Sequence, residues 1–172
     1  MVGLAVLDVL IDLGVEGARL KWPNDVWIQG SKLAGILVEL ANRGSSTIAV
    51  IGLGMNIALT PEERAAVDQP IADLLSRGVA VDRNSLLMAF VEKMASYLRH
   101  FEHSGFEAFR SAFDAVHLLH RRDVVVPSAT EGKSLLTHGS VEGVGGSGQL
   151  LIRTSRGLEE MLGGEVSLRP AD

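Results

Sequence analysis

A change of pattern near residue 120 constrains the fold of this chain more than any other feature. Before it, apolar repeats at helical spacing alternate with segments rich in β-branched residues; after it come short strand-like segments separated by glycine turns. Five short strands are expected there, at 124–126, 135–144, 149–153, 157–162 and 165–168. They favour a β-barrel of about 50 residues, which is too small to be robust alone. The pattern therefore predicts two domains, residues 1–119 and 120–172.

The first domain is expected to combine helices with a sheet. Apolar residues recur at i, i+3 and i+4 in three segments that predict helices, at 2–13, 83–103 and 106–118. Turn signals separate four predicted strands, at 18–22, 26–28, 33–40 and 47–57. One short helix is expected near 71–77, within the connecting region. The fold class is α+β, with a mixed sheet and packed helices.

Composition excludes several classes of function. The net charge is −5 with scattered basic residues, which argues against a nucleic-acid partner. There are no cysteines, so disulfides and thiolate sites are excluded. No apolar run approaches the ~20 residues of a membrane span. Asp8 and Asp12 interrupt the apolar start, which lacks a basic region and so does not resemble a signal peptide. A cytoplasmic location is expected.

Four polar residues around one turn are candidates for phosphate and nucleotide binding. Lys21 and Lys32 lie at predicted strand ends, and a lysine ammonium is a compact charge suited to phosphate oxygens. On spacing alone, two solvated strand-end lysines are the favoured interpretation. Asn24 and Asp25 occupy the turn between them, where Pro-Asn-Asp is ordinary turn chemistry. The functional alternative is an amide that binds a base and a carboxylate near Mg²⁺.

Glycines inside predicted strands point to a trough. Gly52, Gly54 and Asn56 fall at i, i+2 and i+4 of one strand and share a face. Gly35 lies in a neighbouring strand. Glycine in a strand weakens it and often marks a close approach of backbone or ligand. A trough walled by Leu37 and closed by the Asn56 amide would take a flat apolar ligand. The alternative is β-bulges, or a helix that packs tightly on the sheet.

Three blocks in this order resemble the catalytic domain of the biotin–protein ligases: KWPND at 21–25, KLAGILVE at 32–39 and GLGMNI at 52–57. The resemblance continues to GGEVSLRP at 163–170. It implies part of a class II synthetase-like catalytic domain, followed by an SH3-like C-terminal domain. It also implies a two-step reaction with ATP, biotin and Mg²⁺. Biotinyl-5′-AMP forms first, and a lysine of the biotin carboxyl carrier protein of acetyl-CoA carboxylase then takes the biotin.

The resemblance also implies roles for individual residues. Lys32 would contact the reacting carboxyl and phosphate oxygens, with Lys21 assisting. The residues implied for biotin are Lys32, Gly35, Leu37, Gly52 and Gly54. The residues implied for ATP are Asn24, Asp25, Asn56, Glu165 and Arg169, with Asp25 also near the metal.

The chain departs from the family pattern in two respects. It has no GRGR-like run for a loop over the adenylate, and no winged-helix DNA-binding head. We therefore expect a truncated ligase with little activity alone, and a bare sheet edge that favours homo-oligomers. A non-catalytic nucleotide-binding or dimerisation module is the alternative. A lipoate ligase of the same general fold is a third possibility, disfavoured by the biotin-type blocks.

Overall fold

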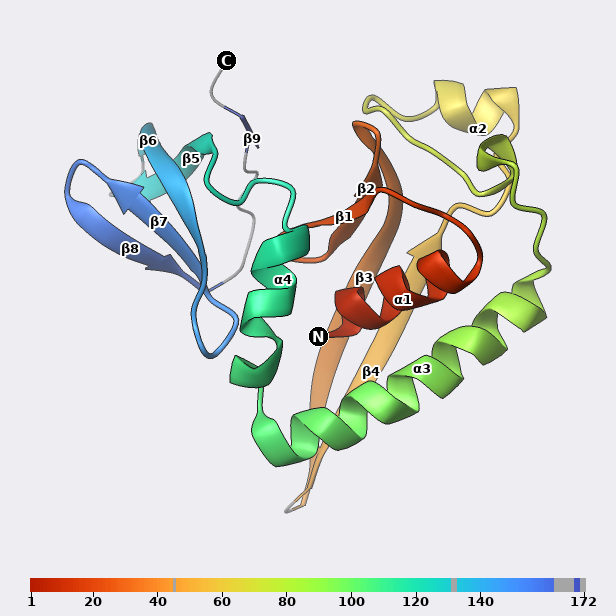
Figure 1. Ribbon diagram of the computed structural model, residues 1–172. Coiled ribbons are helices and arrows are strands. Elements are labelled where there is room, and N and C mark those ends of the chain that lie inside the picture. The colour runs from red at the N-terminus through yellow and green to blue at the C-terminus, as the bar shows by residue number, and fades with distance from the viewer. Residues whose placement is uncertain (45, 131–132, 163–168, 171–172) are drawn as a thin grey trace. The chain divides into compact units, whose positions relative to one another are not determined.

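The computed structural model describes two compact units, residues 1–99 and 100–172 (Figure 1). Within them it describes the backbone of 1–44, 46–130, 133–162 and 169–170, and the side chains of 1–44, 46–125 and 138–162. The boundary between the units falls at residues 99 and 100, earlier in the chain than the expected 119 and 120. The helix at 110–116 belongs to the second unit because it packs on a strand of that unit. The assignment of 1–119 and 120–172 to two functional domains stays a prediction.

The first unit contains a four-stranded antiparallel sheet in the order β1-β2-β3-β4. Its strands are β1 Ala18–Lys21, β2 Asp25–Ile28, β3 Ser31–Arg43 and β4 Ser46–Met55. The prediction of a mixed sheet is wrong, since its one parallel contact in the described chain is an isolated bridge between Lys32 and Ile71. Short turns join these consecutive strands, and such turns connect antiparallel neighbours, whereas parallel ones need a long crossover.

Helix α1, Val2–Asp12, packs on β1 and β2 and buries most of its length. Gly14, with a φ of 78°, follows its last turn and ends it. The long helix α3, Arg83–Ser104, is held to α1 by the Tyr97 hydroxyl, which donates to Asp8 at 2.9 Å. Residues of β3 alternate, so Ala34 and Ile36 are buried in the core below α1. The opposite face of the sheet is left open for a site.

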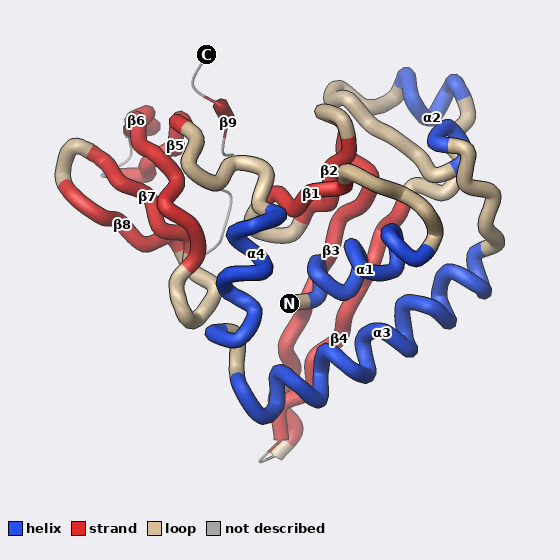
Figure 2. The backbone as a smooth tube through the Cα atoms, viewed as in Figure 1, coloured by secondary structure: helices blue, strands red, loops and turns tan. Residues whose placement is uncertain are grey.

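The segment between β4 and α3 contains a helix that the sequence prediction missed. In Figure 2 this loop carries α2, Pro61–Ala65. Thr60 caps it in a capping box, accepting from the Glu63 amide at 3.2 Å and donating its own amide to the Glu63 carboxylate at 2.8 Å. Thr-Pro-Glu-Glu is a recognisable helix-start signal. The short helix expected near 71–77 is a 3₁₀ turn, η1, Leu75–Arg77.

The second unit contains a five-stranded sheet in the order β8-β7-β6-β5-β9. Its strands are β5 Asp123–Thr130, β6 Lys133–Val144, β7 Leu150–Thr154, β8 Gly157–Met161 and β9 Arg169–Pro170. The helix expected at 106–118 is found as η2, Glu107–Phe109, and α4, Arg110–Val116. The strand expected at 165–168 lies outside the described residues. No pairing within the described part joins β8 to β9, so the closed SH3-like barrel stays a prediction.

None of the helices in the described ranges has both the length and the apolar composition needed to cross a membrane.

Asp114 fastens α4 to the second sheet. Its Oδ1 accepts a hydrogen bond from the backbone N–H of Val144 at 2.9 Å, and Val144 is fully buried. We expect Asp114→Ala to lower the free energy of unfolding by about 1–3 kcal/mol, because it leaves a buried donor unsatisfied. Asp114→Asn keeps an oxygen acceptor and should lose much less. Urea titration followed by circular dichroism measures both, and equal stability of the two variants would contradict this role.

His117 is a buried neutral histidine in the same unit. Its ring is 4% exposed and lies 5.4 Å from the Phe113 ring, centroid to centroid. Neither ring nitrogen has a hydrogen-bond partner within the described chain. Burial, together with the smaller effect of the neighbouring His120 charge, lowers the pKa of His117 to about 4. Protonation therefore favours the unfolded chain, where the histidine pKa returns to about 6.5.

We expect the second unit to lose stability as pH falls from about 6.5 to about 4. Below about 4 both states are protonated and this contribution no longer changes. His117→Phe keeps an aromatic ring without a titratable group, so it should remove this part of the pH dependence. Urea midpoints measured for both proteins across this pH range test the effect. Parallel curves would show that His117 makes no contribution.

Candidate functional site

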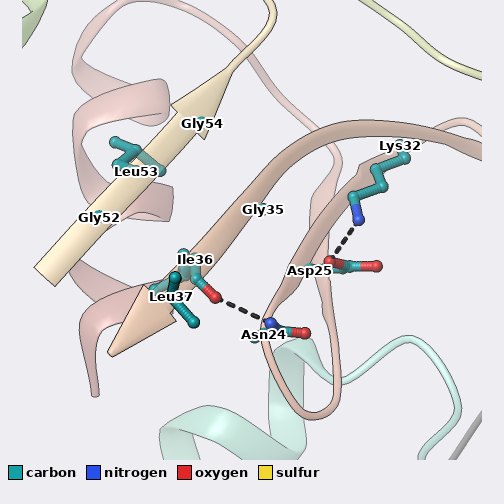
Figure 3. Close-up of a pocket in the computed structure, with 9 residues that line it drawn as sticks. All are labelled: Asn24, Asp25, Lys32, Gly35, Ile36, Leu37, Gly52, Leu53 and Gly54. Carbon is teal, nitrogen blue, oxygen red and sulfur yellow. Dashed lines mark hydrogen bonds and ion pairs between the residues drawn. The ribbon is translucent and has the colours of Figure 1, made fainter. Parts of the chain in front are cut away.

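A pocket of about 480 Å³ opens on the sheet face away from α1 (Figure 3). It is lined by residues from the turn before β2 and from strands β2, β3 and β4: Asn24, Asp25, Lys32, Gly35, Ile36, Leu37, Gly52, Leu53 and Gly54. Seven of these nine lining residues were singled out in the sequence, and the structure brings them together in one place. The other two are Ile36 and Leu53.

Strand register puts the glycines at the floor of this pocket. Asp25, Gly35 and Gly54 lie opposite one another across β2, β3 and β4. Leu37 pairs with Gly52 in the next row on the same face. The middle of the pocket is therefore bare backbone, with the Leu37 side chain beside it.

Packing within the protein does not require these glycines. A Cβ built on Gly35 would lie 3.6 Å from the Lys32 Nζ and 3.7 Å from the Asp25 Oδ1. A Cβ on Gly54 would lie 3.9 Å from the Gly35 carbonyl oxygen. These are ordinary contact distances, and neither residue has a positive φ. This geometry favours the trough over tight helix packing, because what the glycines keep open is space for a ligand.

Lys32 and Asp25 form an ion pair at the edge of the floor. The Lys32 Nζ lies 2.7 Å from the Asp25 Oδ1, and their side chains are 27% and 22% exposed. Figure 3 shows the two side chains pointing toward each other. An incoming anion therefore meets an ammonium group that is already fixed in place and partly shielded from water.

The Asn24 side chain is held by the strand beside it. Its Nδ2 donates to the Ile36 carbonyl at 2.8 Å, and the Ile36 amide donates to the Asn24 carbonyl at 2.8 Å. The amide nitrogen is therefore used within the protein. A ligand that needs this N–H would have to break the bond, whereas the amide oxygen can accept without doing so.

A second pocket of about 430 Å³ adjoins the first and shares Lys32, Gly35 and Gly54 with it. Its other lining residues are Ala34, Asn56, Leu59, Glu63, Ala66, Val67, Gln69 and Ile71. The Asn56 Nδ2 donates to the Ala72 carbonyl at 2.9 Å, so Asn56 lies in this second pocket instead of closing the first. The lining between 59 and 71 was missed in the sequence, although the capping box at Thr60 marked a structured segment.

Lys21 lines neither of the two pockets. Its Nζ lies 4.9 Å from the centre of the Trp27 ring, a cation–π distance, on the strand next to Asp25. Its role beside Lys32 stays a prediction. Glu165 lies outside the described residues. The backbone of Arg169 pairs with Val125, and its side chain lies outside the described set.

A resident metal centre finds little support in the described part of the chain. It holds no group of three or more His, Asp or Glu residues able to bind a metal ion. Asp25 supplies one carboxylate, already paired with Lys32. Mg²⁺ is commonly bound by one or two carboxylates together with substrate phosphates. Asp25 therefore fits an ion that arrives with a nucleotide, but not one held by the protein alone.

Comparison with known proteins shows which family the chain resembles. A family model described as "Biotin/lipoate A/B protein ligase family" matches residues 2–56. The chain is 33% identical to the bifunctional ligase/repressor BirA of Escherichia coli K12, covering 100% of this chain and 53% of that protein. It is 31% identical to the biotin–[acetyl-CoA-carboxylase] ligase of Paracoccus denitrificans, covering 95% of this chain and 69% of that protein. The chain thus spans about half the length of the E. coli relative.

The fold has a solved counterpart. The biotin protein ligase from Aquifex aeolicus in complex with biotin and ATP matches with a TM-score of 0.79 and 26% sequence identity. The match covers 99% of this chain and 69% of that chain.

Proposed function

Since the chain belongs to the biotin–protein ligase family, we propose that it provides the adenylating site of a biotin–[acetyl-CoA-carboxylase] ligase. The observation that carries the proposal is that Lys32 lines both adjoining pockets. One pocket has a glycine floor and an apolar wall at Leu37, which suits the ring system of biotin. The other suits a nucleotide. The Lys32 ammonium then lies where a carboxylate and an α-phosphate would meet.

In the first step, a biotin carboxylate oxygen forms a bond to the α-phosphorus of ATP, and pyrophosphate leaves with the electrons of the broken P–O bond. Negative charge builds on the phosphoryl oxygens in this step. A fixed ammonium aimed at that charge stabilises the transition state more than the ground state. The ion pair with Asp25 keeps the Lys32 Nζ in position before the ligands arrive.

In the second step, a lysine amine of the biotin carboxyl carrier protein attacks the carbonyl carbon of biotinyl-5′-AMP. An amide forms, AMP leaves with the electrons of the C–O bond, and the attacking nitrogen releases a proton to solvent. Lys32 would stabilise the oxyanion here also. The first pocket, which receives the acid substrate, is open to an incoming chain, since Leu37 is 59% exposed. We place the reaction in the cytoplasm.

The remaining residues have supporting roles in this proposal. Asp25 would hold Mg²⁺ together with the nucleotide phosphates, and the ion would supply further neutralisation of phosphate charge. Asn24 lines only the first pocket, so its amide oxygen would accept from the acid, and Asn56 would hold the wall of the nucleotide pocket. Lys21 would assist Lys32, and Glu165 and Arg169 would support ATP binding.

Self-association is part of the proposal. β4 is the outer strand of its sheet, and apolar side chains of β3 and β4 are exposed beyond the pocket: Val38 47%, Leu40 71%, Ile48 43% and Val50 55%. A long, apolar outer strand favours pairing with a second copy. Light scattering over a range of concentrations tests this, and a monomer throughout would contradict it.

Biotin-dependent exchange of pyrophosphate into ATP tests the proposed function, with lipoate as the competing acid. We expect pyrophosphate exchange with biotin and none with lipoate. The rate with biotin should be low, because the open first pocket lets water reach the adenylate. The alternative, a non-catalytic nucleotide-binding module, is favoured by the same openness at Leu37. Calorimetry separates the two, since ATP binding without any biotin binding or exchange would support the module and contradict the ligase.

A further inference from the structure

The backbone of Lys32 is held by a segment that lies outside the sheet. The Lys32 amide donates to the Pro70 carbonyl at 2.9 Å, and the Lys32 carbonyl accepts from the Ala72 amide at 2.9 Å. Both backbone polar groups of Lys32 are therefore bound to the segment Pro70–Ala72. On its other side, the pairing of β2 with β3 is irregular next to Lys32, between Val26 and Trp27. The position of Lys32 therefore depends on where this segment lies.

The segment is in turn fixed by an ion pair between Arg64 and Asp73. Asp73 is 1% exposed, and its carboxylate contacts the Arg64 guanidinium. Its Oδ1 also accepts from the Ser76 amide at 2.8 Å. Arg64 donates a further hydrogen bond to the Ile71 carbonyl at 3.4 Å. One guanidinium thus binds the segment on both sides of Ala72, immediately beside Lys32.

Arg64 comes from α2, next to Glu63, which lines the nucleotide pocket. A connected path of contacts therefore runs from α2 through Arg64 and Asp73 to the segment Pro70–Ala72, and from there to Lys32. A buried carboxylate without its partner is strongly unfavourable, because its charge is then uncompensated. Removal of Arg64 is therefore expected to loosen the Asp73 end of the segment and to leave the sheet intact.

We propose that the Arg64–Asp73 ion pair positions the Lys32 ammonium for the reaction. The inference rests on the proposed function for its chemistry but not for its structural part. Arg64 and Asp73 are positioning residues: they act on the reacting oxygens only through the backbone of Lys32. When the pair is broken, Lys32 keeps its charge but loses its fixed place. The turnover rate then falls, while the glycine floor that receives the acid stays unchanged.

Amide hydrogen exchange followed by NMR tests the structural part. In Arg64→Ala, the amides of Lys32 and Ala72 should exchange about tenfold faster or more, through local opening. The internal reference is the Ile36 amide, which lies in the same strand as Lys32 and donates to the Asn24 carbonyl. Its exchange should not change. Asp73→Asn is a milder second variant, since its amide oxygen can still accept from Ser76. Unchanged exchange at Lys32 and Ala72, or equal acceleration along all of β3, would overturn the inference.

Kinetics test the chemical part. Arg64→Ala should lower kcat for biotin-dependent pyrophosphate exchange about tenfold and leave KM for biotin nearly unchanged, because misplacement of a catalytic group affects the rate. Arg64→Lys, which keeps the cation, should recover part of the rate. Lys93→Ala removes a more exposed ion pair of the first unit, with Asp12 at 2.8 Å, from outside both pockets and should change neither.

The outcomes separate the two ideas. If the Lys32 amide of Arg64→Ala exchanges its hydrogen faster but kcat stays at the wild-type value, the positioning role is overturned. If the Lys32 amide exchanges faster but the wild-type protein shows no pyrophosphate exchange, the proposed ligase function is overturned. The structural link from Arg64 to Lys32 then stands by itself.

Discussion

A Lys32→Met variant is expected to lose biotin-dependent ATP–pyrophosphate exchange by about two to three orders of magnitude. Methionine keeps the apolar stem of lysine and removes only the ammonium, so the pockets should keep their shape. Loss of a fixed donor aimed at developing charge has an effect of this size in other acyl-transfer sites. Exchange of labelled pyrophosphate into ATP at saturating biotin measures the rate. A variant that keeps most of its exchange rate would rule out Lys32 as the catalytic cation.

Lys93→Met is the matched control for this experiment. Lys93 forms an ion pair with Asp12 at 2.8 Å and is 30% exposed, close to the 2.7 Å and 27% of Lys32 with Asp25. It lines neither pocket. Both variants therefore remove one partly exposed ion pair from the first unit, and only the Lys32 variant changes the site. An equal loss of rate in both would indicate a general effect of lost ion pairing.

Gly54→Val is expected to weaken binding of both ligands about ten- to a hundredfold without lowering stability. Gly54 lines both pockets, so added methyl groups intrude on both. Overfilling a packed site typically costs about 1–3 kcal/mol, or about ten- to a hundredfold in affinity. The Cβ itself meets only ordinary contacts, and valine suits a strand better than glycine. Calorimetry with ATP and with biotin, beside a thermal melt, therefore separates loss of the site from loss of the fold.

Two further variants sharpen this result. Gly52 lines the first pocket only, so Gly52→Val should weaken biotin and spare ATP. Ala49→Val adds the same methyl groups to β4 outside both pockets and should spare both ligands. If all three variants lost both ligands equally, the two pockets could not be assigned to different substrates.

Local patterns in the sequence were enough to place the glycines on one face, but they left open whether that face was a trough or a packing surface. Strand residues alternate between faces, so Gly52 and Gly54 had to share one, and Leu37 had to share the face of Gly35. What the sequence did not contain is the register, in which Gly35 meets Gly54 and Leu37 meets Gly52. That register depends on how the β3–β4 hairpin turns, and a shift by one residue would have turned the glycines to the core.

Contacts between distant segments explain most of what could not be predicted. Asn56 was expected to close the trough, but β4 ends at Met55 and the Asn56 amide instead binds Ala72. Lys21 was expected to assist Lys32, a role that stays a prediction, and its ammonium lies over Trp27. The bridge between Lys32 and Ile71 joins residues far apart in the chain, and no periodicity records such a contact. The mixed sheet was wrong for a simpler reason: the short turns between strands already indicated hairpins.

The glycine floor has an evolutionary consequence: substitutions in it can change the size of the acid that is accepted in one direction only. Backbone atoms form the deepest surface at Gly35, Gly52 and Gly54, and no substitution can take atoms away from glycine. Every mutation at these three positions adds volume, so it can lead only to shorter or thinner acids. Descendants of this chain that accept a bulkier acid would have to gain room at the rim, where Leu37 is a side chain that can still be shortened.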